Sequence, residues 1–274
     1  MPVDEFKLIN PPVLAVFMTD ESNGREVTLP ASDSEEAQKV YEQGLQMFND
    51  GQTREAFETF VRATEIDPNC VDACVALARS FLTMDGQKYS DEAFFYGEQA
   101  YSADPNNPKA RNVASSANFE KGKMAWDTQN WDGAVRYFKR AYELEPKAET
   151  LSALGYCAEK ANMLADFADV CDKRLKQQPD DHPVKYILGR SYAKMAIDGS
   201  SAPDMAWIRT ERLRRAEVQL MDYLATDSLN GHANYWLGIV YFMTDRLDEA
   251  SHIVAKLQKI DPDRSKELEE FLAG

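Results

Sequence analysis

The stretch WDGAVRYFKRAYELEP, residues 131–146, occurs in closely related form at two other places in the chain. Residues 54–68 read REAFETFVRATEIDP, and residues 247–262 read LDEASHIVAKLQKIDP. A catalytic motif normally occurs once in a chain, whereas a recurring unit indicates architecture. The recurrence therefore predicts a protein built from repeats, and it is informative about the fold before it is informative about function.

Each copy has the pattern of a helix that ends at a proline. Proline stops a helix because it lacks a backbone N–H and restricts the residue before it. Upstream, a small residue is followed by a large one four positions later and by another small one three positions after that, so that all three share one helical face. The closing pairs are Asp67-Pro68, Asp104-Pro105, Glu145-Pro146 and Asp261-Pro262, and the small and large residues are Ala56, Phe60 and Ala63 in one copy and Ala134, Phe138 and Ala141 in another.

A second predicted helix precedes each of these and has a small residue at its centre. A glycine in the middle of a helix costs about 0.5–1 kcal/mol relative to alanine. Small residues at matched places therefore indicate that two helices approach each other closely. They are Gly44, Ala78, Gly122, Gly155, Gly189 and Gly238.

This helix–turn–helix pattern resembles the tetratricopeptide repeat (TPR), a unit of 34 residues. Six units fit the chain, at residues 37–70, 71–107, 115–147, 148–181, 182–230 and 231–264. The fourth unit departs most from the pattern, because Phe167 and Arg174 stand where small residues are expected. The resemblance implies an all-α, right-handed superhelical solenoid with a concave groove. We expect an array over residues 35–264 and a C-terminal capping helix over residues 265–274.

Residues 1–34 lie outside the repeats. They contain an Asn-Gly turn signal and two short β-like runs, at residues 13–18 and 26–29. The alternatives are a small hairpin that caps the first repeat, an extended arm that lies in a groove, or a tail without fixed structure. The segment is therefore predicted to be a short non-helical N-terminal extension.

Composition limits the classes of partner. The formal net charge is −15, and a nucleic-acid or anionic-membrane binder needs a basic face. The apolar run at residues 11–18 is far shorter than the roughly 20 residues of a membrane-spanning helix. We therefore expect a cytoplasmic protein that binds no nucleic acid and does not insert into membranes. Its four cysteines, Cys70, Cys74, Cys157 and Cys171, form no CxxC pair, so no metal is expected.

No enzymatic motif stands out. The chain has no GxxxxGK[ST], GxSxG, HExxH or GxGxxG sequence. Its three histidines, His182, His232 and His252, have no nucleophile or carboxylate pattern beside them. We expect a protein without catalytic activity and without a cofactor.

The remaining candidate site is the concave groove, which the first helix of each unit lines in the family. Its predicted residues are rich in aromatics, with basic side chains in the middle, a composition typical of binding hot spots and suited to an acidic or aromatic partner. The same aromatics could instead pack between neighbouring repeats. The groove residues are Tyr41, Phe48, Arg79, Phe119, Lys123, Trp126, Tyr156, Lys160, Tyr186, Arg190, Lys194, Tyr235 and Phe242.

The sequence thus predicts a scaffold or adaptor that binds an extended peptide or a helix of a partner protein. Two alternatives stay open: self-assembly, in which the N-terminal arm docks on a neighbouring copy, and a chaperone for one client. Some family members hold acidic tails through a two-carboxylate clamp, but its residue types are missing at the matching places here. A second surface is predicted around Trp207, within an insertion of the fifth unit at residues 197–211.

Overall fold

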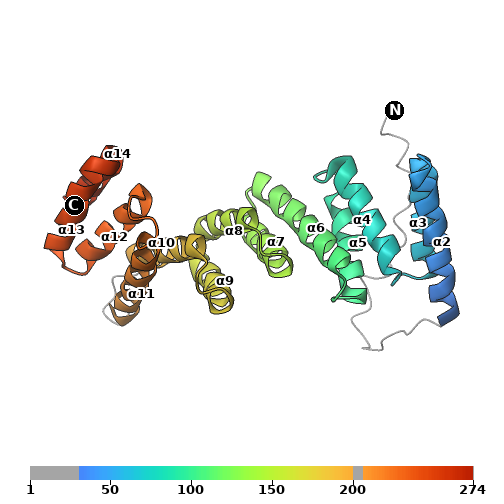
Figure 1. Ribbon diagram of the computed structural model, residues 1–274, viewed down its shortest axis with the longest axis horizontal. Helices are drawn as coiled ribbons and strands as arrows, with labels where there is room; N and C mark the ends of the chain where they lie inside the picture. The colour runs from blue at the N-terminus through green and yellow to red at the C-terminus, as the bar shows by residue number, and fades with distance from the viewer. Residues whose placement is uncertain (1–30, 200–205, 274) are drawn as a thin grey trace. The chain divides into compact units, whose positions relative to one another are not determined.

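The structure is a computed structural model that describes residues 31–199 and 206–273 (Figure 1). Within these residues it contains thirteen helices and no strand, and the predicted all-α solenoid class is confirmed. The non-helical extension was predicted over residues 1–34: residues 1–30 lie outside the described part of the chain, and residues 31–34 were wrongly predicted, because they belong to α2. The helices are α2 (Ala31–Asn49), α3 (Thr53–Ile66), α4 (Val71–Asp85), α5 (Ser90–Ala103), α6 (Pro108–Asp127), α7 (Trp131–Leu144), α8 (Ala148–Lys160), α9 (Leu164–Gln177), α10 (His182–Asp198), α11 (Ala206–Leu224), α12 (Gly231–Met243), α13 (Leu247–Ile260) and α14 (Pro262–Leu272).

The chain divides into two compact units, residues 1–70 and residues 71–274. In the first unit α2 and α3 form one antiparallel hairpin. Its helices approach closely because Gly44 lies against the ring of Phe60, where an added Cβ would come within 2.8 Å of a ring carbon. Tyr41 covers the same ring, with 5.6 Å between the two ring centroids.

The second unit is a row of five hairpins that ends in α14. Each helix packs on the next, and first helices also touch across repeats, α4 on α6 and α10 on α12 (Figure 1). Residues 108–114, which lie between the second and third predicted units, form the first turns of α6, where the Asn107 side chain accepts hydrogen bonds from the Lys109 and Ala110 N–H groups. The predicted insertion at residues 197–211 includes the end of α10 and the first turns of α11, and residues 200–205 within it are not described.

The turns inside the hairpins repeat one backbone feature. Gly51, Gln129, Asn162 and Asp245 each have a positive φ, between 56° and 82°, and each lies 17 residues before a closing proline. A left-handed residue at this point ends the first helix and reverses the chain. Three of the four are not glycine. Asn162 and Asp245 are of types that adopt this conformation readily, whereas at Gln129 the packed hairpin imposes it.

Charged side chains link some neighbouring repeats of the second unit. Arg140 on α7 donates to Glu98 on α5 over 2.9 Å, and Arg246, which precedes α13, donates to Glu217 on α11 over 2.6 Å. These pairs join second helices of consecutive repeats. These side chains are only partly shielded from solvent, and ion pairs in such positions contribute little to stability. Their main effect is to orient the neighbouring helices.

Helix α14 covers the end of the row. Leu268 is fully buried against Gly238 of α12, and Phe271 packs edge-on against Phe242 at 5.9 Å between ring centroids. This helix includes residues 265–272 of the predicted capping segment, and its exposed side chains include Lys266, Glu267, Glu269 and Glu270. Within residues 31–199 and 206–273, no helix is long and apolar enough to cross a membrane.

Candidate functional site

The predicted groove residues all lie on first helices of the hairpins, α2, α4, α6, α8, α10 and α12. Tyr41 and Phe48 belong to the first compact unit, and the other eleven belong to the second. Every one of the thirteen keeps some solvent exposure, and the most exposed aromatics are Phe48 at 54% and Tyr156 at 44%. The set therefore lies on a surface of each unit, and none of it is sealed inside the core.

Four of the predicted residues meet in one pocket of about 470 Å³ between α8, α9, α10 and α11. They are Tyr156, Tyr186, Arg190 and Lys194. We name this space the α8–α10 pocket. Its other lining residues are Leu151, Ser152, Gly155, Glu159, Leu164, Phe167, Pro183, Ile187, Ser191 and Tyr223. The lining is mainly aliphatic and aromatic, and its charged side chains are confined to the C-terminal halves of α8 and α10.

The charged part of the pocket is an internal ion-pair network. Glu159 accepts a hydrogen bond from Arg190 over 2.6 Å and lies 3.6 Å from the Lys194 ammonium. Lys194 also lies 3.3 Å from Asp198, and the Arg190 guanidinium lies 5.9 Å from the ring centroid of Trp236. Both predicted cations of the pocket are therefore already paired with carboxylates of the same chain.

Two tyrosines of the pocket, Tyr186 and Tyr223, have a raised pKa and are neutral at ordinary pH. Burial raises the pKa of the Tyr186 hydroxyl, and nearby Arg190 and Arg264 oppose that rise. Burial also raises the pKa of Tyr223, and the hydrogen bond from its hydroxyl to Asp227 acts in the same direction. The Tyr186 and Tyr223 rings pack together with 5.3 Å between their centroids.

An aromatic cluster adjoins the pocket through Tyr156. The Tyr156 ring stacks on Trp126 of the preceding repeat at 4.5 Å between centroids and with 12° between planes. Trp131 meets both rings edge-on, and the Lys160 ammonium lies 5.6 Å from the Tyr156 centroid. Tyr156 therefore belongs both to the interface between repeats and to the open surface.

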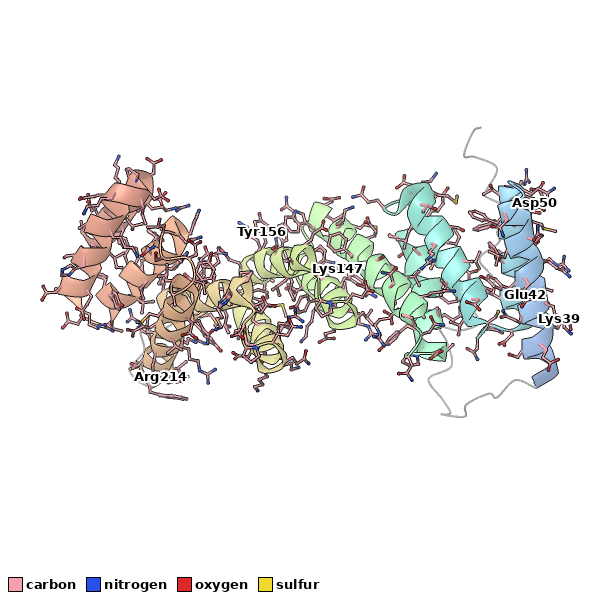
Figure 2. The ribbon with its side chains drawn as sticks, viewed as in Figure 1. Lys39, Glu42, Asp50, Lys147, Tyr156 and Arg214 are labelled. Atoms are coloured by element: carbon pink, nitrogen blue, oxygen red, sulfur yellow. The ribbon has the colours of Figure 1, made fainter. Side chains whose placement is uncertain are left out.

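A second pocket, of about 390 Å³, lies along α4, α6 and the start of α8. It brings together the predicted residues Arg79 and Phe119 with Lys147, and hydroxyl groups of serine and threonine make it more polar. Figure 2 labels one residue of each pocket, Lys147 just before α8 and Tyr156 on α8. We name this space the α4–α6 pocket.

The structure places the remaining predicted residues outside both pockets. Lys123 on α6 pairs with Glu120 over 2.9 Å. Tyr235 lies between Trp236 and the Arg264 guanidinium, and Phe242 packs on the capping helix. Trp207, at the start of α11, is 70% exposed, next to the part of the insertion that is not described.

Several residues that line the α8–α10 pocket were not predicted, among them Leu164, Phe167, Ile187 and Tyr223. Leu164 and Phe167 come from the fourth repeat, and Phe167 was visible in the sequence as a departure from the repeat pattern. Ile187 and Tyr223 carry no sequence signal, because aliphatic and aromatic residues are common at helix interfaces.

The described residues offer no metal site. Within residues 31–199 and 206–273, no group of three or more His, Cys, Asp or Glu side chains could hold an ion. The four cysteines are free thiols and buried. Burial raises the pKa of the Cys157 thiol to about 11, which keeps it protonated and unreactive at neutral pH.

Comparisons with known proteins agree on the fold. A family model described as tetratricopeptide repeat matches residues 119–182. Photosystem I assembly protein Ycf3 from Synechococcus sp. (strain CC9605) is 26% identical over 123 residues, which are 45% of this chain and 71% of that protein.

Two solved structures are similar at a TM-score of 0.50. YrrB, described as a TPR protein with an unusual peptide-binding site, is 15% identical, and the match covers 77% of this chain and 97% of YrrB. The Naa15/Naa10 complex bound to HypK-THB is 16% identical, and the match covers 86% of this chain and 34% of the matched chain. At these identities the likeness concerns the fold alone.

Proposed function

Because the chain is a tetratricopeptide repeat protein, we propose that it binds an extended peptide or a helix of a partner protein in the α8–α10 pocket. The fold is that of a protein-interaction scaffold. The observation that carries the proposal is the convergence of four predicted groove residues on one pocket with an apolar lining. A concave apolar surface with a few polar groups is the usual form of a binding site.

The dimensions and residue types support a peptide ligand. A volume of about 470 Å³ lies within the ordinary range of ligand pockets and can hold more than one side chain. Tyr156, Tyr186 and Arg190 are of the types that dominate binding hot spots. Affinity would come from burial of aromatic surface, at about 25 cal/mol for each Å² removed from water.

The comparisons favour the same class of activity. YrrB is described as having a peptide-binding site, and the name of Ycf3 describes an assembly protein. A second candidate function follows from Ycf3: a chaperone that holds one client during assembly of a complex. Both functions require protein binding, and they differ in whether the bound protein is later released into a larger complex.

The test begins with a peptide selected from a displayed random library on the full chain, with its affinity measured by fluorescence anisotropy. Ile187→Arg places a charge in the apolar lining, and Tyr156→Ala removes the exposed ring. We expect each to weaken binding at least tenfold. Val218→Arg makes a comparable change at an exposed position on α11, so it should stay within twofold of the unchanged chain.

Circular dichroism of each variant checks that the helices are retained. Unchanged binding by both pocket variants would contradict the proposal. Light scattering of the full chain over a dilution series addresses the remaining alternative, self-assembly, because assembly through an arm should give a mass that depends on concentration.

A further inference from the structure

We infer that the α8–α10 pocket accepts an uncharged aromatic or aliphatic side chain of the partner, and that Glu159 is the residue that makes it reject carboxylates. The inference rests on the function proposed above and names the chemistry of the occupant. The sequence suited either an acidic or an aromatic partner, and of these two we infer the aromatic one.

The first argument is that Glu159 occupies the place of an acidic ligand. Its two carboxylate oxygens engage different cations, Oε2 with Arg190 at 2.6 Å and Oε1 with Lys194 at 3.6 Å. A partner carboxylate could reach these cations only by displacing Glu159 or by lying beside it, and like charges at such distances repel. The pocket carries its own anion in place of one that a ligand would supply.

The second argument is that the cations are held in place. Lys194 has a second carboxylate, Asp198, at 3.3 Å, and the Arg190 guanidinium lies close to the Trp236 ring. The side chains of Arg190, Lys194 and Glu159 are between 27% and 39% exposed, so the network is partly shielded from solvent. A shielded charge network resists rearrangement more than a freely solvated pair does.

The third argument is a contrast within the same unit. Arg79 lines the α4–α6 pocket, is exposed, and has no ion pair with any residue in the described part of the chain. A cation prepared for an acidic partner would be left open in this way. Arg190 and Lys194 are not, so the two pockets differ in the charge that they can accept.

The fourth argument is the balance of charge around the site. Residues 108–224, which contain the whole α8–α10 pocket, hold 19 Lys and Arg against 17 Asp and Glu. Residues 1–107 hold 7 against 20. The pocket thus lies in a nearly neutral segment of an acidic chain, where no broad positive field attracts an anionic partner. What remains for recognition is the apolar lining of Leu151, Leu164, Phe167 and Ile187.

The test compares the unchanged chain with Glu159→Gln, a substitution of nearly equal shape that removes the negative charge. Each is used in full length to select peptides from the same displayed random library. We expect peptides rich in Phe, Tyr, Trp and Leu from the unchanged chain and peptides rich in Asp and Glu from the variant. Asp169→Asn is the matched control, because it removes one exposed charge from α9 outside both pockets.

Anisotropy with two synthetic peptides completes the measurement. One is the aromatic peptide selected on the unchanged chain, and the other has Glu in place of its central aromatic residue. For the Glu peptide we expect at least tenfold tighter binding to Glu159→Gln than to the unchanged chain, and that gain should shrink in 0.5 M salt. The aromatic peptide should bind both proteins within about threefold.

The outcomes separate the inference from the proposed function. If the unchanged chain selects acidic peptides that Ile187→Arg no longer binds, the pocket is the binding site and the inference about Glu159 is wrong. If the selected peptides bind Ile187→Arg and Tyr156→Ala as tightly as they bind the unchanged chain, both the inference and the proposed function are wrong. If Glu159→Gln and Asp169→Asn gain equal affinity for the Glu peptide, the effect is one of general charge and the specific role of Glu159 is overturned.

Discussion

Repeats three and four solve the same packing problem with large and small residues exchanged. In the hairpin of α6 and α7, Ala134 lies twelve residues before the closing proline and Phe138 lies eight before it. In the hairpin of α8 and α9, the same two places hold Phe167 and Cys171. The aromatic ring therefore enters one helical turn earlier in the fourth repeat.

The exchange changes what surrounds the ring. Phe138 meets Gly122 and lies among the rings of Phe119 and Trp126, all inside the third repeat. Phe167 meets Gly155 and forms part of the α8–α10 pocket. Helices α8 and α9 also pack less extensively than the helices of the other hairpins. The difference teaches that a departure from the repeat pattern can mark the place where a solenoid opens a site.

The largest expected effect comes from truncating each ring. Phe138→Ala should lower the free energy of unfolding by about 3–5 kcal/mol, because the ring is enclosed on all sides and leaves a cavity. Phe167 is equally buried but lines the α8–α10 pocket, so Phe167→Ala should cost at least about 1 kcal/mol less, because water can enter the cavity from that pocket. Urea denaturation followed by circular dichroism measures both. Equal losses in the free energy of unfolding would show that the pocket does not reduce the cost of the cavity at Phe167.

The second prediction exchanges the residues of the fourth repeat back to the usual pattern. The double variant Phe167→Ala with Cys171→Phe conserves much of the side-chain volume, so we expect a folded chain. It moves the ring one turn along α9 and removes it from the pocket. A library-selected peptide should therefore bind at least tenfold more weakly, or about 1.4 kcal/mol less favourably.

The reciprocal exchange in the third repeat, Ala134→Phe with Phe138→Cys, is the control. It disturbs a hairpin of the same architecture without touching the α8–α10 pocket, so the affinity for the peptide should be retained. Loss of binding in both double variants would indicate that the peptide depends on the array as a whole.

Much of the architecture could be predicted from the sequence, because it depends on local periodicity. The closing prolines, the central small residues and the i, i+4, i+7 spacing define thirteen described helices and their pairing. The irregular fourth repeat was also visible in Phe167. The sequence could not show that Glu159 lies against Arg190, because that distance depends on how α8 and α10 pack. Nor could it decide whether Tyr235 and Phe242 line a groove or pack in an interface, since an aromatic residue on a first helix suits both equally well.

The third prediction concerns the central glycines. A Cβ at Gly122 would meet three ring atoms of Phe138 at 2.7–3.0 Å, whereas at Gly155 only one ring atom of Phe167 lies within 3.0 Å. Gly122→Ala should therefore destabilise the chain by about 1–2 kcal/mol, after the gain in helix propensity is deducted. Gly155→Ala should cost less, because the ring can yield toward the pocket. Thermal unfolding of the two variants side by side tests the order, and a larger cost at Gly155 would contradict it.

The smallest expected effect is a pH dependence of stability at the contact between α9 and the next repeat. The Tyr192 hydroxyl on α10 donates to Asp172 on α9 over 2.7 Å and accepts from Arg215 on α11 over 2.9 Å. Burial, with the bond to Asp172, raises the pKa of Tyr192 to about 12, and Arg215 opposes the rise. A hydroxyl whose pKa is higher in the folded chain stabilises the fold below its unfolded pKa of about 10, and that stabilisation is lost as the pH rises from about 10 to 12.

Tyr192→Phe should therefore cost about 0.5–1.5 kcal/mol at pH 8, the usual contribution of one hydrogen bond. Between pH 10 and 12 the free energy of unfolding should fall less steeply for the variant, by at most about 1.4 kcal/mol per pH unit, because one titrating proton is removed. Urea denaturation at pH 8, 10 and 11.5 gives both slopes. Tyr241→Phe on α12 is the control, since burial raises the pKa of that hydroxyl beside Glu217 and Arg246, away from the α9–α10 contact. Equal slopes for Tyr192→Phe and the unchanged chain would show that the hydroxyl does not couple the fourth repeat to the fifth. The difference between repeats three and four would then be limited to the residues around the α8–α10 pocket.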